Sequence, residues 1–273
     1  MKYIDCKKYA QEILDKVKEA PYKKKLAIIT VGDDEASKSY VKGKMKDCEY
    51  CGIPVEHIKI EDNEYAHGEL FDCIFRKNHD ISVAGIIVQL PLPEHLGDPS
   101  AYTNLIAPNK DVDGFIDNSP FKPCTPKGIM YLLEKELGDL TGLNALVIGR
   151  GDLVGKPLAK MLLDADCTVT VAHSKTKNLY KHLLESDIIV SAVGKPNFLD
   201  LGMCWNADIV IDVGINRNKD GKLCGDCYVY EEDLDYDIVP DIKVTPVPGG
   251  VGLLTRAMLM QNVLEASEGK FYE

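Results

Sequence analysis

The sequence has 273 residues, of which 45% are hydrophobic and 27% charged, and its net charge at pH 7 is −11. This length suits two domains of about 100–150 residues each. The acidic balance argues against a general nucleic-acid or anionic-membrane binder, although a local lysine cluster can still bind a small anion. The first twenty residues are charged and amphipathic, and no run approaches the length of a membrane span, so we expect a cytoplasmic protein.

Short runs rich in β-branched residues predict strands at 25–32, 55–60, 83–90, 144–149, 168–173, 187–194 and 208–214. Most of these runs lack apolar/polar alternation, as strands buried on both faces do. Segments with apolar residues spaced three and four apart predict helices between them, for example at 4–17, 40–51, 129–137 and 154–163. Strands that alternate with helices indicate an α/β protein with parallel sheets.

Residues 36–53 predict a helix that begins near Ser37 as N-cap and ends at Gly52 as C-cap. Tyr40 and Lys44 stand four apart and therefore share one face of this helix. They could form an acid/base pair, because removal from water disfavours the charged form of a lysine. The alternative is a solvated helix face formed by Lys38, Lys42, Lys44 and Lys46.

Polar residues follow next in chain order. "VQLPLP" (88–93) ends a predicted buried strand on Gln89, which presents an amide at the carboxyl edge of a parallel sheet, where ligands bind. "KDVDGF" (110–115) offers Asp111 and Asp113, either of which could accept two N–H bonds from a planar heterocycle. The alternatives are a D-x-D metal site and a plain Asp-Gly turn. No third ligand stands nearby in the sequence, so we expect no metal there.

Three prolines interrupt the pattern in residues 117–128, which we take as the boundary between two domains. Pro126 fits the first turn of a helix that leads into a second α/β unit. We therefore expect two α/β domains flanking a cleft. Small ligands usually bind in such clefts between domains.

The segment "NALVIGRGDLVGKPLAKMLL" (144–163) combines a strand, a glycine turn and a helix. Its glycines, Gly149, Gly151 and Gly155, have a looser spacing than the usual dinucleotide fingerprint. They still permit a tight turn and let a phosphate approach the N-terminus of the helix. Two further strands follow, so the second domain is predicted to be a Rossmann-type parallel sheet that binds a nucleotide.

The end of the next strand favours NADP over NAD. An NAD site usually has an acidic residue there, whereas this chain has His173 and Ser174, followed by Lys175 and Lys177. No carboxylate would repel a 2′-phosphate, and Arg150 lies in the glycine turn. The alternative is that the two lysines belong to a solvated loop.

The two C-x-x-C pairs, Cys48/Cys51 and Cys224/Cys227, raise the possibility of a zinc or redox site. They lie far apart in the chain, and most intracellular cysteines are small buried apolar groups. We therefore expect free thiols and no metal. Near the C-terminus, "TPVPGGVGLLT" (245–255) combines prolines and glycines, as expected where backbone must approach a ligand closely.

Eight segments in order resemble the methylenetetrahydrofolate dehydrogenase/cyclohydrolase family: "SKSYVKGK", "VQLPLP", "KDVDGF", "PCTPKG", "VIGRGDLVGKP", "AHSKT", "VIDVGIN" and "TPVPGGVG". The resemblance spans residues 37–262. It implies an NADP-dependent enzyme of one-carbon metabolism and purine biosynthesis, active as a homodimer. Such an enzyme oxidises 5,10-methylenetetrahydrofolate to the methenyl cation and hydrolyses that cation to 10-formyltetrahydrofolate. It also implies a folate-binding catalytic domain of residues 1–120 plus 252–273 and a coenzyme-binding domain of residues 121–251.

The resemblance also implies roles for individual residues. Lys44 is the catalytic lysine, Gln89 orients it, Tyr40 stacks on the folate ring system, and Asp113 holds the pterin. The remaining substrate contacts are Ser37, Pro248 and Gly249. The coenzyme contacts are Gly149 and Gly151 at the pyrophosphate, Arg150, His173 and Ser174 at the adenosine end, and Ile215 at the nicotinamide.

Three departures from the family pattern carry expectations. Gly151 replaces a common serine, so one hydroxyl contact to phosphate is expected to be missing. "GDCYV" (225–229) replaces "GDVDF", which alters the packing of that loop, and Leu253 replaces a proline, which is expected to loosen the start of the last helix.

Two other functions stay open as alternatives. One is a non-catalytic folate- or nucleotide-binding regulator, against which the joint presence of Lys44, Gln89 and Asp113 argues. The other is a different NADP oxidoreductase with two α/β domains, which would not be expected to carry "YVKGK", "VQLPLP" and "PVPGGVG" together.

Overall fold

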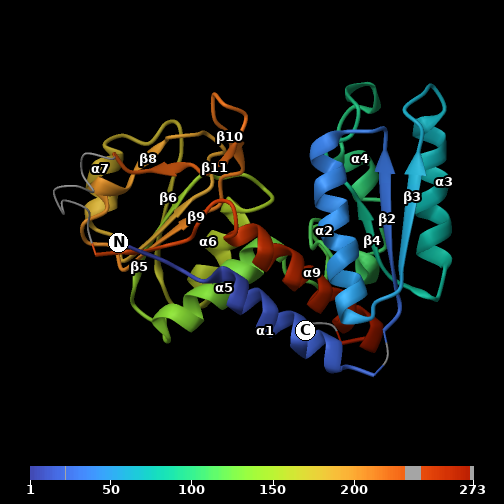
Figure 1. The fold of residues 1–273 in the computed structure, drawn as a ribbon, viewed down its shortest axis with the longest axis horizontal. Helices are drawn as coiled ribbons and strands as arrows, with labels where there is room; N and C mark the ends of the chain where they lie inside the picture. Colours follow the sequence, from blue (N-terminus) through green and yellow to red (C-terminus); the bar gives the residue numbers. More distant parts are fainter. Residues whose placement is uncertain (22, 231–240, 271–273) are drawn as a thin grey trace. The chain divides into compact units, whose positions relative to one another are not determined.

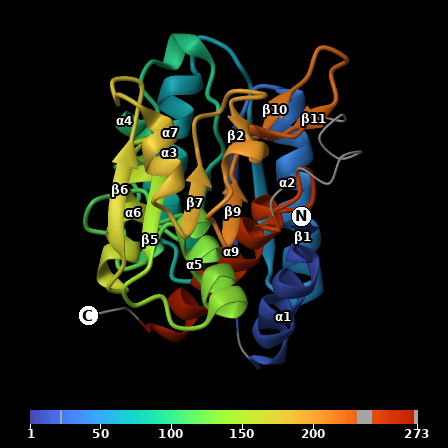
Figure 2. The same ribbon diagram turned by 90° about the vertical axis from the view of Figure 1, so that its left-hand side faces the viewer.

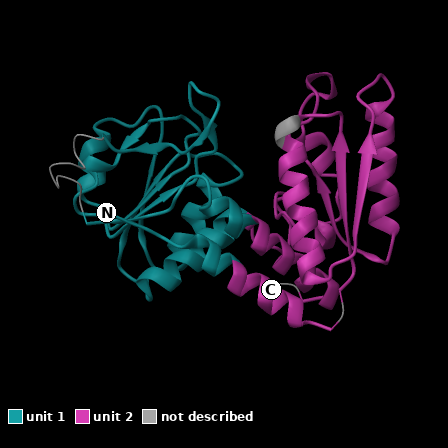
Figure 3. Cartoon of the chain, in the orientation of Figure 1, with its two compact units in different colours: residues 1–10, 125–255 teal, residues 11–124, 256–273 magenta. Residues whose placement is uncertain are grey.

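The computed structural model describes residues 1–21, 23–230 and 241–270. Clustering of the backbone divides the chain into two compact units (Figure 3). Unit 1 contains residues 1–10 and 125–255, and unit 2 contains residues 11–124 and 256–273. Two helices contribute to both units, namely α1 (Cys6–Glu19) and α9 (Val251–Glu268).

Unit 2 is built on a three-stranded parallel sheet in the order β3-β2-β4. The strands are β2 (Lys25–Val31), β3 (Val55–Ile60) and β4 (Val83–Val88). Two long helices, α2 (Glu35–Cys51) and α3 (Ala66–His79), lie on either side of these strands in Figure 1. The short helices η1 (Glu94–Leu96), α4 (Ser100–Thr103) and η2 (Pro108–Lys110) complete the unit.

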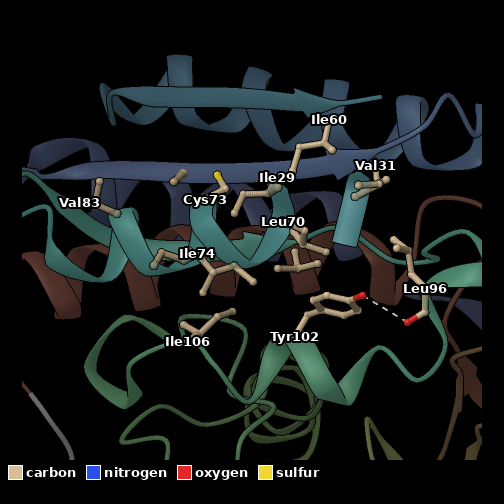
Figure 4. Packing of buried hydrophobic residues seen from close by; sticks show 14 residues of the cluster. Ile29, Val31, Ile60, Leu70, Cys73, Ile74, Val83, Leu96, Tyr102 and Ile106 are labelled. Atoms are coloured by element: carbon tan, nitrogen blue, oxygen red, sulfur yellow. Dashed lines mark hydrogen bonds between the residues drawn. The ribbon is translucent and has the colours of Figure 1, made fainter. Parts of the chain in front are cut away.

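One face of this sheet forms a dry core with α3 and α4, shown in Figure 4. Alternate residues of β2 point into it, and Ile29 packs with Leu70 and Ile74 of α3. Tyr102 of α4 is 1% exposed, and its hydroxyl donates to Leu96 O at 3.3 Å. Because β2 is buried on both faces, its sequence is a continuous apolar run rather than an alternating one.

Unit 1 contains a six-stranded parallel sheet in the order β1-β13-β9-β7-β5-β6. Its strands are β1 (Lys2–Tyr3), β13 (Lys243–Val244), β9 (Ile209–Asp212), β7 (Ile188–Ser191), β5 (Asn144–Ile148) and β6 (Thr168–Ala172). Figure 2 shows β6, β5, β7 and β9 side by side. The helices of the unit include α5 (Cys124–Leu137), α6 (Gly155–Asp164) and α7 (Leu179–Leu184). The predicted fold class, two α/β units with a Rossmann-type second sheet, is confirmed.

Short elements lie after the carboxyl ends of these strands. A hairpin joins β10 (Asn216–Arg217) to β11 (Leu223–Cys224). A parallel pair joins β8 (Leu199–Asp200) to β12 (Cys227–Tyr228). A 3₁₀ turn, η3 (Leu201–Met203), follows β8.

The N-terminal residues belong with unit 1 because β1 pairs with β13. The backbone N–H of Lys2 donates to Ile242 O at 2.8 Å. The predicted folate-binding domain began at residue 1, whereas residues 1–10 belong to unit 1 and the other described part of that range to unit 2. A two-residue strand paired across more than two hundred residues leaves no periodic signal in the sequence.

One expectation about a helix start is wrong. The N-cap of α2 is Asp34 and not Ser37, since Asp34 Oδ2 accepts the Ser37 N–H at 2.7 Å. The left-handed C-cap at Gly52 is confirmed. At the start of α9, the N–H of Leu253 donates to Gly250 O at 3.0 Å, a bond that proline could not make, and the looser helix start stays a prediction.

All nine cysteines are free thiols in the structure. Burial raises the pKa of the Cys48 thiol to about 12 and that of Cys51 to about 11. Thiols of this kind are poorly reactive, because the thiolate is the nucleophile. Within the described ranges, no group of three or more His, Cys, Asp or Glu side chains is placed to hold a metal ion. None of the helices in these ranges is both long and apolar enough to cross a membrane.

Candidate functional site

The centre of the predicted site in unit 2 is a buried lysine hydrogen-bonded to a buried amide. Lys44 lies on α2 and is 7% exposed, and Gln89 follows β4 and is 9% exposed. Lys44 Nζ donates to Gln89 Oε1 at 3.1 Å. The structure therefore joins two residues that the sequence separates by 45 positions, and it contradicts the alternative of a fully solvated lysine face.

The amide of Gln89 is fixed by its own neighbours. Its backbone N–H donates to Ile29 O at 2.8 Å, which continues the β2–β4 ladder beyond the end of β4. Its side-chain Nε2 donates to Leu90 O at 2.7 Å, so Oε1 is left to accept from Lys44. A fixed acceptor holds the amine of Lys44 at the carboxyl edge of the sheet, which is where open parallel sheets bind ligands.

Tyr40 lies one turn before Lys44 on α2, near Asp113. Burial raises the pKa of the Tyr40 phenol, the Asp113 carboxylate raises it further, and the guanidinium of Arg256 opposes both. The phenol therefore stays protonated at neutral pH, which leaves it as a ring for stacking and a hydroxyl donor rather than a base.

The motif "KDVDGF" contains two carboxylates of different kinds. Asp111 is 2% exposed, its Oδ2 accepts the Ile116 N–H at 3.0 Å, and burial raises its pKa. Asp113 is only partly buried. Asp111 thus holds the turn together, whereas Asp113 is accessible to a ligand.

Arg256 is a cation of this site that the sequence analysis missed. It lies on α9, and its Nε is 2.8 Å from Asp47 Oδ2 of α2, an ion pair without a well-directed hydrogen bond. Its guanidinium crosses α2 at Gly43, where an added Cβ would come 2.2 Å from Nη1. The glycine in "YVKGK" therefore makes room for the arginine. No local pattern links residues so far apart in the sequence.

Replacing Arg256 by methionine is expected to destabilise the protein by about 1–3 kcal/mol at neutral pH, because it leaves the Asp47 carboxylate buried without its cation. Burial raises the pKa of Asp47, and Arg256 lowers it, so the pKa rises further in the variant. A raised folded-state pKa contributes stability that is lost as the pH rises through it. The deficit should therefore shrink as the pH falls.

Urea unfolding of wild type and Arg256→Met at about pH 7.5 and about pH 5.5 measures this change. Arg76→Met, on the exposed surface of α3, removes the same charge as a control. A deficit that is equal at both pH values would contradict the role given to Asp47.

A cavity of about 780 Å³ opens beside another part of α2. Ser37 and Gln89 line it, together with Lys38, Val41 and Lys42. Tyr40, Lys44 and Asp113 lie outside its lining. The buried polar groups of the predicted site are the hydrogen-bonded pair Lys44 and Gln89, and Lys44 does not line this cavity. The cavity by itself therefore does not mark the reaction site.

Unit 1 has a cavity of about 540 Å³ at the carboxyl ends of β5, β6 and β7. It brings together the predicted coenzyme residues Gly149, Arg150, Gly151, His173 and Ser174. Thr176 and Lys195 also line this cavity, although no sequence motif pointed to them. Lys195 could have been found from its place directly after the predicted strand at 187–194.

The glycine turn has the close backbone contacts that the sequence predicts. Gly149 has φ +119°, and an added Cβ would lie 2.3 Å from Ala192 O. At Gly155 it would lie 2.2 Å from Gly149 O. Nothing lies within 4 Å of such an atom at Gly151, so this position has room for the serine common in the family.

Three further predicted residues, like Tyr40, Lys44 and Asp113, lie outside both cavity linings. Ile215 is 58% exposed before the β10–β11 hairpin. Pro248 and Gly249 are exposed before α9, and Gly249 has φ +99°, which favours glycine. The chain offers bare backbone at this point, as its proline- and glycine-rich sequence predicts.

Known proteins resemble the chain over almost its entire length. The family "Tetrahydrofolate dehydrogenase/cyclohydrolase" matches in two parts, the catalytic domain over residues 4–113 and the NAD(P)-binding domain over residues 123–271. The bifunctional protein FolD of Campylobacter curvus is 43% identical over 288 residues, which cover 99% of this chain and 97% of the relative.

Solved structures agree with this match. The bifunctional FolD of Campylobacter jejuni superimposes with a TM-score of 0.89 at 39% identity, covering 99% of this chain and 100% of that one. FolD of Trypanosoma brucei, solved with NADP and an inhibitor, gives a TM-score of 0.86 at 30% identity and covers 98% and 97%.

Proposed function

The chain belongs to the tetrahydrofolate dehydrogenase/cyclohydrolase family, and we propose on this premise how its residues carry out the family's two reactions. It is an NADP-dependent enzyme that oxidises 5,10-methylenetetrahydrofolate to the 5,10-methenyl cation and hydrolyses this cation to 10-formyltetrahydrofolate. The observation that carries the proposal is the buried hydrogen bond from Lys44 to Gln89.

NADP⁺ supplies a hydride acceptor when it is bound. The cavity of unit 1 fits it, because the turn at Gly149 and Gly155 leaves no room for side chains and lets phosphate approach the backbone. Arg150 would hold the adenosine 2′-phosphate, with Ser174 and His173 beside it. Ile215 would lie along the nicotinamide, which agrees with its exposure.

Lys44 serves both steps through its amine. Loss of hydride leaves a cation on the folate, so an uncharged amine nearby favours the oxidation over a charged one. Hydrolysis then requires a water molecule to lose a proton as it attacks the methenyl carbon. The amine can accept that proton as a general base, and Gln89 keeps it directed toward the reacting carbon.

The folate is held by groups around the lysine. The phenol ring of Tyr40, with its hydroxyl protonated, would stack on the folate ring system. Asp113 would accept N–H hydrogen bonds from the pterin. Ser37 supports the same site, since its hydroxyl donates to Leu90 O at 3.4 Å, beside Gln89. The family resemblance assigns a further substrate contact to the exposed backbone of Pro248 and Gly249, which belong to unit 1.

One absorbance experiment tests this function. Purified protein is given methylenetetrahydrofolate with NADP⁺ and, separately, with NAD⁺, and the methenyl product is followed. We expect product to form with NADP⁺ and to decay faster than in a reaction from which the enzyme has been removed. Formation without accelerated decay would remove the hydrolase activity, and no formation with either coenzyme would remove the dehydrogenase.

The family resemblance and one exposed surface support a homodimer. Phe71 and Phe75 are four apart on α3 and are 46% and 58% exposed. Neighbouring apolar side chains exposed on one helix are characteristic of a surface that another chain covers. Sedimentation equilibrium should give a dimer for wild type and a smaller dimer fraction for Phe75→Lys. A monomeric wild type would contradict this assignment.

We place the enzyme in the cytoplasm and its product in purine biosynthesis, which consumes 10-formyl groups. Deletion of the gene should create a growth requirement for purines that the wild-type gene relieves and the Lys44→Met gene does not. Growth of the deletion strain without purines would contradict this placement.

A further inference from the structure

Asp226 is a fully buried carboxylate in unit 1 that neither reaction uses. It belongs to "GDCYV", one of the segments where the sequence departs from the family, and it is 0% exposed. A buried charge of this kind is costly unless hydrogen bonds satisfy it. Its partners therefore show which part of the fold needs the charge.

One oxygen of this carboxylate binds the chain that follows β7. Asp226 Oδ2 accepts from Ser191 Oγ at 3.1 Å, from the Val193 N–H at 2.9 Å and from the Gly194 N–H at 3.2 Å. The other oxygen, Oδ1, accepts from the Lys195 N–H at 2.9 Å. Three successive backbone amides thus converge on one anion, an arrangement known as a nest.

The nest forms a wall of the coenzyme cavity. Val193 and Lys195 line that cavity together with Ala192 and Phe198. The backbone N–H of Phe198 donates to Asp226 O at 2.7 Å, so the main chain of Asp226 holds the far end of the same segment. Asp226 therefore holds residues 193–195 with its side chain and Phe198 with its main chain.

The same carboxylate also reaches the segment that carries Ile215. Asp226 Oδ1 accepts from Asn216 Nδ2 at 2.9 Å. An added Cβ at Gly214 would lie 2.3 Å from Asp226 Oδ1, so only glycine permits this approach. Both neighbours of Ile215 are thus packed against Asp226.

Asp212, at the end of β9, braces the arrangement from behind. Its Oδ1 accepts the N–H groups of Asp226 and Gly214, both at 2.9 Å, and its Oδ2 accepts the Cys227 N–H at 2.8 Å. Burial raises the pKa of Asp212, and these N–H groups oppose the rise. Gly225 is required beside it, since an added Cβ would come 1.9 Å from Asp212 Oδ2.

We infer that Asp226 is a positioning residue for the coenzyme: it fixes the cavity wall at 192–198 and the Ile215 segment relative to each other. The inference rests on the proposed function, because it uses the assignment of this cavity to NADP. Asp226 does not touch the reacting atoms. It determines whether the adenosine side and the nicotinamide side of the cavity fit one coenzyme molecule at the same time.

Asp226→Asn tests this role with little change of shape. The asparagine NH₂ must replace an oxygen that accepts from backbone N–H groups, so at least one of these groups loses its acceptor. A displaced wall should raise the KM for NADP⁺ by about 10- to 100-fold. The hydrolysis of methenyltetrahydrofolate uses no coenzyme, so its kcat and KM should stay within about twofold of wild type.

Asp187→Asn is the matched control. Asp187 Oδ2 accepts the Asn144 N–H at 2.7 Å at the opposite, amino edge of the same sheet. The same substitution there can lower stability but should leave the KM for NADP⁺ unchanged. Equal KM values for NADP⁺ in the two variants would overturn the inference, while an inactive wild type would instead overturn the proposed function.

If Asp226→Asn fails to fold, Ser191→Ala and Asn216→Ala remove one donor each and leave the carboxylate in place. Each should raise the KM for NADP⁺ several-fold relative to Asp187→Asn and leave the hydrolysis unchanged. Normal KM values in both would overturn the inference, since a merely structural carboxylate would affect only stability.

Discussion

Lys44→Met is expected to lower the rate of methenyltetrahydrofolate hydrolysis by about 10²- to 10⁴-fold, the usual contribution of a general base. Methionine fills a similar volume but cannot accept the proton of the attacking water. The variant should still fold and bind folate, because Tyr40 and Asp113 are untouched and the site is walled by α2 and β4. Decay of methenyl absorbance measures the rate, and isothermal titration calorimetry measures folate binding.

Lys42→Met is the control for this change. Lys42 is exposed on the same helix, so the substitution removes the same charge and keeps the helical propensity. Its hydrolysis rate should stay close to wild type. Hydrolysis at the wild-type rate in Lys44→Met would show that Lys44 is not the base. A loss of both hydrolysis and folate binding would assign the lysine to binding instead.

Arg150→Ala is expected to raise the KM for NADP⁺ by about 10- to 100-fold and to change the KM for NAD⁺ little. The estimate follows from the loss of a charge-assisted hydrogen bond, worth about 1.5–3 kcal/mol, to a group that only NADP carries. Arg150 is exposed and lines the cavity together with Ser174 and Lys195. Steady-state kinetics with both coenzymes give the two values.

Lys177→Ala controls for the general loss of positive charge, since Lys177 is exposed and lies outside the cavity lining. An equal rise for both coenzymes in Arg150→Ala would contradict its contact with the 2′-phosphate. Lys195→Ala distinguishes the remaining candidate, because a rise specific to NADP⁺ in this variant alone would move the phosphate contact to Lys195.

Much of the fold was predictable because the central strands of its sheets, such as β4, β7 and β9, are buried on both faces. Runs such as residues 25–31 and 188–191 are continuous apolar stretches between helices of regular spacing, and the predicted strands all form. The glycine turn was also predictable. Gly155 is required by a close contact within the turn, and Gly149 by one with Ala192, which follows the neighbouring strand β7. In each case the structure leaves a pattern among residues that are close together in the sequence.

The helix start at α2 shows how local signals can compete. Asp34 and Ser37 are both good N-caps, and the choice depended on which residue closed the first turn. Leu253 illustrates a different limit: the sequence shows the absence of proline, but not that the Leu253 N–H reaches the carbonyl of Gly250.

Without the family resemblance, the sequence predicts some features of the site and not others. The spacing of Tyr40 and Lys44 placed them on one face, because four residues are about one helical turn. The hydrogen bond from Lys44 to Gln89 depends on the packing of α2 against the end of β4, and the pair Arg256–Asp47 on the packing of α9 against α2. Asp226 shows the same limit, since its partners include Ser191 at the end of β7, Val193 after it and Asn216 after β9.

The sequence by itself determined the α/β class, the strand and helix positions, the nucleotide turn and, through its ordered motifs, the family. These follow from periodicity and local backbone geometry, which act over a few residues. Only the tertiary structure decided which polar groups are buried together: Gln89 with Lys44, Asp47 with Arg256, and Asp226 with the backbone N–H groups of residues 193–195. Such pairs form because a buried polar group must find a partner, and that partner is wherever the packed elements bring one within about 3 Å.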